Sequence, residues 1–174
     1  MNKGVIAIVL GLSLVAGSAT FSRAADSRRV SAKLIGFQEV PAISSTGRGN
    51  FRASIDGTSI QFELSYSGLE STVTQAHIHF GQTSVSGGIV IFLCSNLGNG
   101  PAGTPACPQS GTVTGTRMAS DVVGGAADQG ISAGEFDEVL RAIRTGNAYA
   151  NVHTTEHPAG EIRGQIGSSD DDED

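Results

Sequence analysis

Short runs in which apolar and polar side chains alternate with a period of two constrain the fold of this chain more than any other feature. In the clearest case, apolar residues alternate over 51–55 and again over 60–66, on either side of Asp56 and Gly57. A period of two places successive side chains on opposite faces of a β-strand, and an Asp-Gly pair between two such runs is a strong hairpin signal. Similar runs, separated by turn residues, occupy residues 27–37, 75–81, 89–93, 112–117, 147–154 and 161–166. This spacing predicts an all-β sandwich rather than alternating strands and helices.

One segment departs from the strand pattern and predicts a short helix before the penultimate strand. Ser132 and Glu135 have the spacing of a capping box, and they precede four apolar residues that fall on one helical face: Phe136, Val139, Leu140 and Ile143. Gly146 is expected to end the helix. We expect the apolar stripe to cover one open end of the sandwich.

The length of the chain, 174 residues, suits one domain with a proper core. Residues 1–24 combine a basic start, an apolar run over 5–17 and small residues near Ala19 and Ala24, which predicts a secretory signal peptide. A retained anchor is the alternative, but the apolar run is shorter than the ~20 residues that span a bilayer, and no other segment comes closer. We therefore predict a periplasmic or secreted protein with the folded domain at 28–167, an acidic disordered tail at 168–174 and no membrane span in the mature chain.

Export bears on the two cysteines, because an oxidising compartment allows a pair to form a disulfide. Cys94 and Cys107 flank a loop rich in glycine and proline, and we expect them to be bonded. A thiolate metal site is the alternative.

The charge of the chain is acidic, with a formal net charge of −6. Five acids form the run Asp170–Asp174, which lacks the spacing of a calcium loop and is dispensable for folding if it remains solvated. The net negative charge of the chain argues against nucleic acid as a partner.

All four histidines lie in two of the strand segments and the loop after one of them. His77 and His79 share one face of a strand by their spacing, His153 lies on a second strand, and His157 follows in the TTEHPAG loop. Several imidazoles on one face can bind a transition metal, and copper is favoured over zinc for such ligands. A polar surface patch with satisfied hydrogen bonds is the alternative for the same residues.

Three segments carry a resemblance: AKLIGFQEVPAISSTGRGNF at 32–51, AHIHFG at 76–81 and NAYANVHTTEHPAGEIRGQI at 147–166. Together they resemble the CHRD domain, a module named after chordin and found in bacterial extracytoplasmic proteins. The resemblance implies a Greek-key β-sandwich of the immunoglobulin-like or superoxide-dismutase-like kind. It also implies a non-enzymatic module that binds another extracellular protein.

A second resemblance concerns the histidines. HIHFGQT at 77–83, NVHT at 151–154 and HPAGEIRGQIG at 157–167 are similar to motifs of the copper-zinc superoxide dismutases. It implies that His77, His79 and His153 correspond to copper ligands and that Arg163 corresponds to the arginine that attracts superoxide. A zinc subloop and a bridging histidine are missing, so the resemblance points to copper alone, and a copper-only dismutase is a further alternative function.

The acids near His157 allow another interpretation. Glu156 and Glu161 flank His157, which makes acid-base chemistry conceivable. We expect instead that Glu161 pairs with Arg163 or with a neighbouring strand. The sequence therefore leaves two main hypotheses, a metal-binding extracytoplasmic protein and an extracellular interaction module.

Overall fold

The computed structural model describes Met1 and residues 28–169, and the described part of the chain is almost entirely β. Its nine strands are β1 (Arg28–Ile35), β2 (Arg48–Ile55), β3 (Ile60–Ser67), β4 (Val73–Phe80), β5 (Gly88–Ser95), β6 (Gly111–Arg117), β7 (Ala148–Thr154), β8 (Ile162–Gln165) and β9 (Gly167–Ser168). One α-helix, α1 (Phe136–Arg144), and three single-turn helices, η1 (Gly36–Gln38), η2 (Ala119–Asp121) and η3 (Ala127–Gln129), complete the fold. The predicted signal peptide and the acids of the predicted tail lie outside the described residues.

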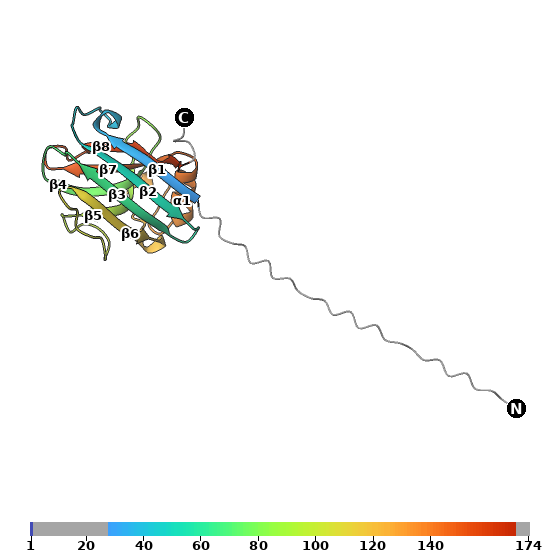
Figure 1. Ribbon diagram of the computed structural model, residues 1–174. Coiled ribbons are helices and arrows are strands. Elements are labelled where there is room, and N and C mark those ends of the chain that lie inside the picture. The colour runs from blue at the N-terminus through green and yellow to red at the C-terminus, as the bar shows by residue number, and fades with distance from the viewer. Residues whose placement is uncertain (2–27, 170–174) are drawn as a thin grey trace.

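The strands form one antiparallel sheet in the order β5-β4-β7-β8-β1-β2-β3-β6, with β9 added beside β1. The sheet folds into two halves, β5-β4-β7-β8 and β1-β2-β3-β6, which face each other across the core (Figure 1). The chain passes between the halves four times, after β3, β5, β6 and β8, and β6 returns to lie beside β3. This confirms the predicted Greek-key β-sandwich.

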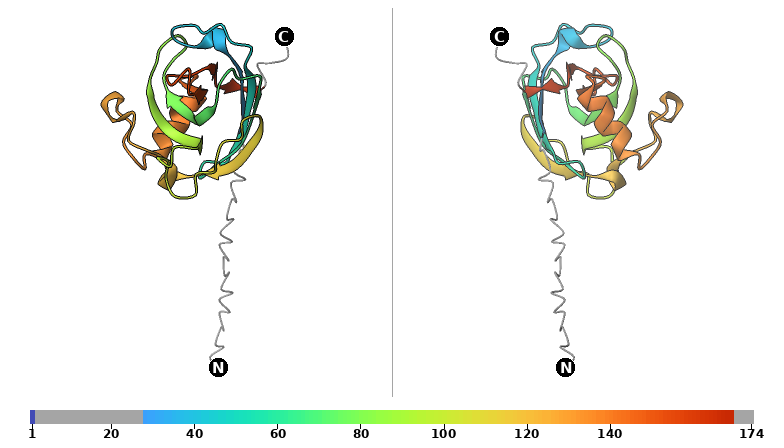
Figure 2. Two further views of the ribbon diagram at one scale, coloured as in Figure 1. Left: turned by 90° about the vertical axis from the view of Figure 1, so that its left-hand side faces the viewer. Right: turned by 90° about the vertical axis from the view of Figure 1, so that its right-hand side faces the viewer.

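The two halves are joined along both sides, so the sandwich is nearly a closed barrel. On one side β8 pairs with β1 through Ile35 and Arg163. On the other side the buried Arg117 of β6 donates from Nε to the Phe92 carbonyl (2.7 Å) and from Nη2 to the Leu93 carbonyl of β5 (3.2 Å). Figure 2 shows the strands curving round a common interior, with the teal and yellow strands on one wall and the orange helix towards the other.

The predicted hairpin is confirmed as β2 and β3. Its turn is held by Asp56, whose carboxylate accepts hydrogen bonds from the Thr58 and Ser59 backbone N–H groups (2.9 and 2.8 Å), and Gly57 takes the left-handed conformation with φ 91°. Phe51 and Phe62 stack across the two strands inside the core. The pattern of alternation therefore sets both the register and the buried face.

The predicted helix is present, but its capping differs from the prediction. The Ser132 backbone N–H donates to Glu135 Oε2 (2.7 Å), as in a capping box, yet the helix begins only at Phe136 and has no side-chain cap. All four predicted stripe residues are buried, and the helix lies near β7 and β9. Gly146, with φ 70°, follows the end of the helix as expected. At nine residues α1 is far too short to cross a membrane, and the described residues contain no helix that could.

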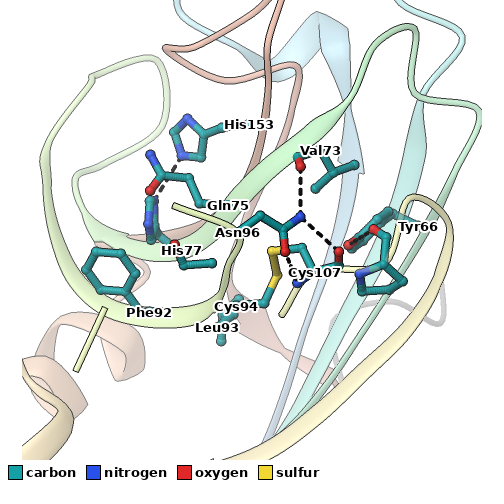
Figure 3. The surroundings of a disulfide bond; sticks show 12 residues. Tyr66, Val73, Gln75, His77, Phe92, Leu93, Cys94, Asn96, Cys107 and His153 are labelled. Atoms are coloured by element: carbon teal, nitrogen blue, oxygen red, sulfur yellow. Dashed lines mark hydrogen bonds between the residues drawn. A yellow bond between two sulfur atoms is a disulfide. The ribbon is translucent and has the colours of Figure 1, made fainter. Parts of the chain in front are cut away.

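The predicted disulfide is confirmed between Cys94 at the end of β5 and Cys107 in the next loop. Asn96 fastens the same loop, because its side-chain amide donates to the carbonyls of Val73 (2.9 Å) and Cys107 (3.0 Å) and its Oδ1 accepts from the Cys107 N–H (2.9 Å). Figure 3 shows this arrangement. The loop between the cysteines is thus restrained by a covalent bond and by the hydrogen bonds of the Asn96 side chain.

Candidate metal centre

Three of the four histidines converge on the outer face of the β4-β7-β8 half-sheet. β4 pairs with β7 so that His77 lies opposite Asn151 and Gln75 lies opposite His153. Opposite residues and their diagonal neighbours on one face of a sheet lie within contact distance. The expectation that His153 would join His77 and His79 is therefore met in the structure.

The ligand atoms of the three rings are close enough to act together. One nitrogen from each of His77, His79 and His153 lies within 4.8 Å of the others, and His77 Nδ1 is 3.1 Å from His153 Nε2. Two nitrogens bound to one ion at about 2.1 Å can be at most about 4.2 Å apart, so only small ring movements separate this arrangement from a ligand set. Among the described residues, no other group of three histidine, cysteine or acidic side chains has such proximity.

The histidines are buried, which excludes a simple surface patch for them. Their exposed fractions are 0% for His77, 7% for His79 and 4% for His153. Loops that follow η1, β4 and β7 contribute groups that cover this face of the sheet. Glu39 accepts a hydrogen bond from Asn151 (2.5 Å), and the Gln82 carbonyl accepts one from Arg163 (3.0 Å).

Backbone carbonyls orient two of the three rings. A carbonyl can only accept, so His153 Nδ1 carries the proton that it donates to Pro158 O (3.1 Å), and His79 Nδ1 carries the one donated to Gly87 O (2.9 Å). In these neutral rings the lone pair lies on Nε2, and the Nε2 of His153 faces His77 Nδ1 at 3.1 Å. His79 Nε2 and His77 Nε2 are buried and have no hydrogen-bond partner in the described part of the chain. Unpartnered buried nitrogens are rare in native proteins and are the atoms that a metal would satisfy.

The electrostatics of the site keep these imidazoles neutral. Burial is the main cause in each case, and it lowers the pKa of His77 to about 2 and the pKa values of His79 and His153 to about 4. Neighbouring histidines lower the pKa of His77 further. Since the neutral imidazole is the metal-binding form, protons do not compete for these ligands at neutral pH.

Aromatic rings pack against the histidines, and the sequence had not singled them out. The Phe92 ring meets His77 edge to face with centroids 4.4 Å apart, as Figure 3 shows beside the His77–His153 contact. Tyr149 stacks on His79 with centroids 4.8 Å apart. Phe92 lies in an unbroken apolar run that gave no sign of this contact, whereas Tyr149 alternates with Asn151 and His153 and could have been included.

Arg163 is close to the centre but is not at an open rim. It is only 2% exposed, and its guanidinium lies 3.5 Å from the centroid of the Tyr149 ring. Because β7 lies between β4 and β8, the Tyr149 ring separates Arg163 from His79. The positive charge of Arg163 contributes to the lowered pKa of His79.

Two other expected residues have different surroundings from the triad. His157 is half-buried in the loop after β7, where its carbonyl accepts from Gly160 N–H (3.0 Å), and the structure does not bring it to the other histidines. Glu161 is fully buried and accepts from Ser45 Oγ (2.7 Å), the Glu70 N–H (2.8 Å) and Thr154 Oγ1 (2.8 Å). Glu161 therefore forms a hydrogen bond to the neighbouring strand β7, which was one of the two expectations for this residue. It also links that strand to two loops.

The fold and the three segments that resemble the CHRD domain can be compared with known families. The sequence model of the CHRD domain matches residues 30–166. The chain belongs to the CHRD domain family. The match runs from β1 through β8, so this CHRD domain includes all three histidines of the triad. Neither the search of curated proteins nor the search of solved structures found a match. CHRD domains are typical of extracellular proteins.

Proposed function

We propose that this protein is a periplasmic or secreted CHRD-domain protein that binds a transition metal through His77, His79 and His153. The observation that carries the proposal is the convergence of three buried, neutral imidazoles, two of which have an unpartnered nitrogen. Leaving such nitrogens unpartnered in a protein interior costs free energy, and a bound ion would recover it.

Copper is the ion that the donor set favours. All three donors are imidazoles, which suit copper and zinc alike, and Cu(II) stands above zinc in the general order of affinity for divalent metals. Glu39, a carboxylate in one of the covering loops, accepts a hydrogen bond from Asn151, and burial raises its pKa to about 7. The triad thus offers nitrogen ligands without a carboxylate, which argues against magnesium or calcium.

The protein groups around the triad would hold and shield the ion. The carbonyls of Gly87 and Pro158 fix the orientation of two rings, and Phe92 and Tyr149 exclude water from two sides. Three protein donors leave a further coordination position for water or another small ligand. If the ion is copper, that position is where redox chemistry with an anion such as superoxide would occur, and Arg163 is the nearby positive charge that would favour an anion.

Isothermal titration of untagged, chelator-treated protein with Cu(II) and Zn(II) tests the proposal. His79→Ala is expected to weaken Cu(II) binding at least about tenfold, because loss of even an outer partner of a ligand typically costs about 10–100-fold. His157→Ala is the matched control and should bind as the wild type does. Equal and weak binding by the wild type and His79→Ala would end the metal proposal, and a loss of affinity in His157→Ala would make His157 a fourth ligand.

A second candidate function is a non-enzymatic extracellular interaction module, which family membership favours.

If the protein binds copper, a superoxide assay on the copper-loaded protein distinguishes a copper carrier from a copper-only dismutase. Activity that Arg163→Gln reduces without loss of copper would support the dismutase, while an inactive copper-loaded protein would favour storage or transfer.

A further inference from the structure

The face of the molecule opposite the metal centre is a basic, hydroxyl-rich sheet surface. It is the outer face of β1, β2, β3 and β6, where exposed or partly exposed side chains alternate with the buried residues of the core. Arg29, Lys33, Arg48 and Arg52 project from β1 and β2. On these four strands the only acidic residue is Glu63. We call this surface the basic face.

The positive charge of the domain is concentrated on the basic face. After residue 24 the chain has nine basic residues, and five of them lie on β1 and β2. Of the other four, Arg117 and Arg163 are buried and Arg141 forms an ion pair with Glu138. Within residues 28–169 that is the only ion pair, and Glu63, which lies opposite Arg52 in the β2–β3 register, does not form one.

A shallow groove of about 870 Å³ runs across the basic face. Its lining includes two arginines, Arg29 and Arg52, one acid, Glu63, the hydroxyls of Thr114 and Thr116, and Ser169. The basic and hydroxyl groups are donors, which suits carboxylate groups. Ser169 is the residue from which the acidic run continues.

The register of β9 directs the chain towards these arginines. Ser31 pairs with Gly167 and Val30 pairs with Ser168, so β9 runs antiparallel to β1 and ends near Arg28 and Arg29 at the start of that strand. Asp170 to Asp174 follow immediately and carry five negative charges. The most acidic segment of the chain therefore leaves the fold at the edge of its most basic surface.

We propose that the acidic segment 170–174 docks on the basic face and occupies the groove between Arg29 and Arg52. Five extended residues reach about 16 Å, whereas crossing from β1 to β3 requires about 10 Å. Arg52 lies diagonally across from Arg29, because Arg29 pairs with Ser54 and Ser31 pairs with Arg52. One short strand of acids can therefore meet both arginines.

Docking of this kind is electrostatic and sensitive to salt. Exposed ion pairs contribute little free energy each, and salt screens them. The expected dispensability of the tail for folding is therefore compatible with a docked tail. The proposal does not depend on the metal centre, since no histidine takes part.

Comparison of NMR amide shifts between the full chain and a chain ending at Ser169 tests the docking. At about 0.01 M salt, where the Debye length is about 30 Å, we expect shift differences at residues 29, 52, 114 and 116. At about 0.5 M salt these differences should shrink severalfold. In Arg29→Gln/Arg52→Gln they should be lost, whereas the matched control Arg141→Gln/Arg144→Gln should retain them.

Two results would overturn the proposal. Shift differences confined to β9 would mean that the segment stays in solvent, and differences that map to α1 and vanish in the Arg141→Gln/Arg144→Gln control would place it on the helix. A full chain in which Asn or Gln replaces all five acids provides a check that leaves the chain length unchanged. It should behave like the shortened chain.

Discussion

Glu161 shows how one buried side chain connects the histidine triad to the rest of the fold. Its carboxylate is fully buried and holds Ser45, Glu70 and Thr154, which lie in two loops and on β7. Thr154 directly follows His153 on β7, and Glu161 begins the return to β8. The loop that supplies Pro158 O to His153 is thus closed at its base by Glu161.

Replacement of Glu161 by alanine is expected to destabilise the protein by at least about 2 kcal/mol. The change removes three hydrogen bonds, and each donor left buried without a partner costs about 1–3 kcal/mol. Glu156→Ala, in the same loop but exposed, is the matched control and should stay within about 0.5 kcal/mol of the wild type. Urea unfolding measures both, and a wild-type midpoint for Glu161→Ala would contradict the role of this residue.

At the scale of elements, the short strand β8 determines whether the sandwich closes. It has four residues, pairs with β7 along its length and has one paired position with β1, between Arg163 and Ile35. Gly164 permits this close approach, because a Cβ atom there would lie 2.5 Å from the Lys33 carbonyl oxygen. The seam between the two halves thus depends on the absence of a side chain at residue 164.

Gly164→Ala is expected to lower the free energy of unfolding by about 1–3 kcal/mol, since an added methyl group would push β8 away from β1. Gly167→Ala provides the control on β9, where an added Cβ meets no atom within 4 Å. The melting temperature should fall by several degrees in the first variant and remain unchanged in the second. Equal melting temperatures would show that the seam tolerates a side chain.

At the scale of the whole molecule, the buried histidines make stability depend on pH. Their pKa values lie at about 2 to 4 in the folded protein, against 6.5 for a free histidine. Below pH 6.5 the unfolded chain therefore binds protons that the folded, metal-free protein does not, and stability falls. Glu39 acts in the opposite sense, because burial raises its pKa from 4.5 to about 7 and the folded state holds that proton first.

We expect the metal-free protein to lose stability as the pH falls from 6.5 to 4.5. In this range the unfolded chain binds three more histidine protons than the folded protein, and the folded protein binds one more proton at Glu39. The difference is about two protons, so the free energy of unfolding falls by roughly 2–3 kcal/mol per pH unit where the loss is steepest. Glu39→Gln removes the opposing contribution and should steepen the dependence. Chelator-treated protein in urea at several pH values measures this, and a flat profile over that window would contradict the buried, neutral triad.

Local patterns in the sequence determined the strands, the hairpin, the helical stripe and the faces on which the histidines lie. Alternation with a period of two depends only on backbone geometry, so His77 and His79 had to share a face. The pairing of Cys94 with Cys107 followed from there being two cysteines in a chain for which we predict export. Family resemblance was likewise carried by ordered motifs and is confirmed over residues 30–166.

Only the tertiary structure decided which distant segments meet. The pairing of β4 with β7 brought His153 to His77, and His157 stayed apart because its loop turns back at Gly160. The loops that carry Glu39, Gln82 and Pro158 cover the polar face of β4 and β7, and the histidines on that face are therefore buried. Such contacts depend on strand order and loop path, which no local periodicity encodes, and that is why the burial of the triad and the position of Arg163 behind Tyr149 could not be predicted from sequence.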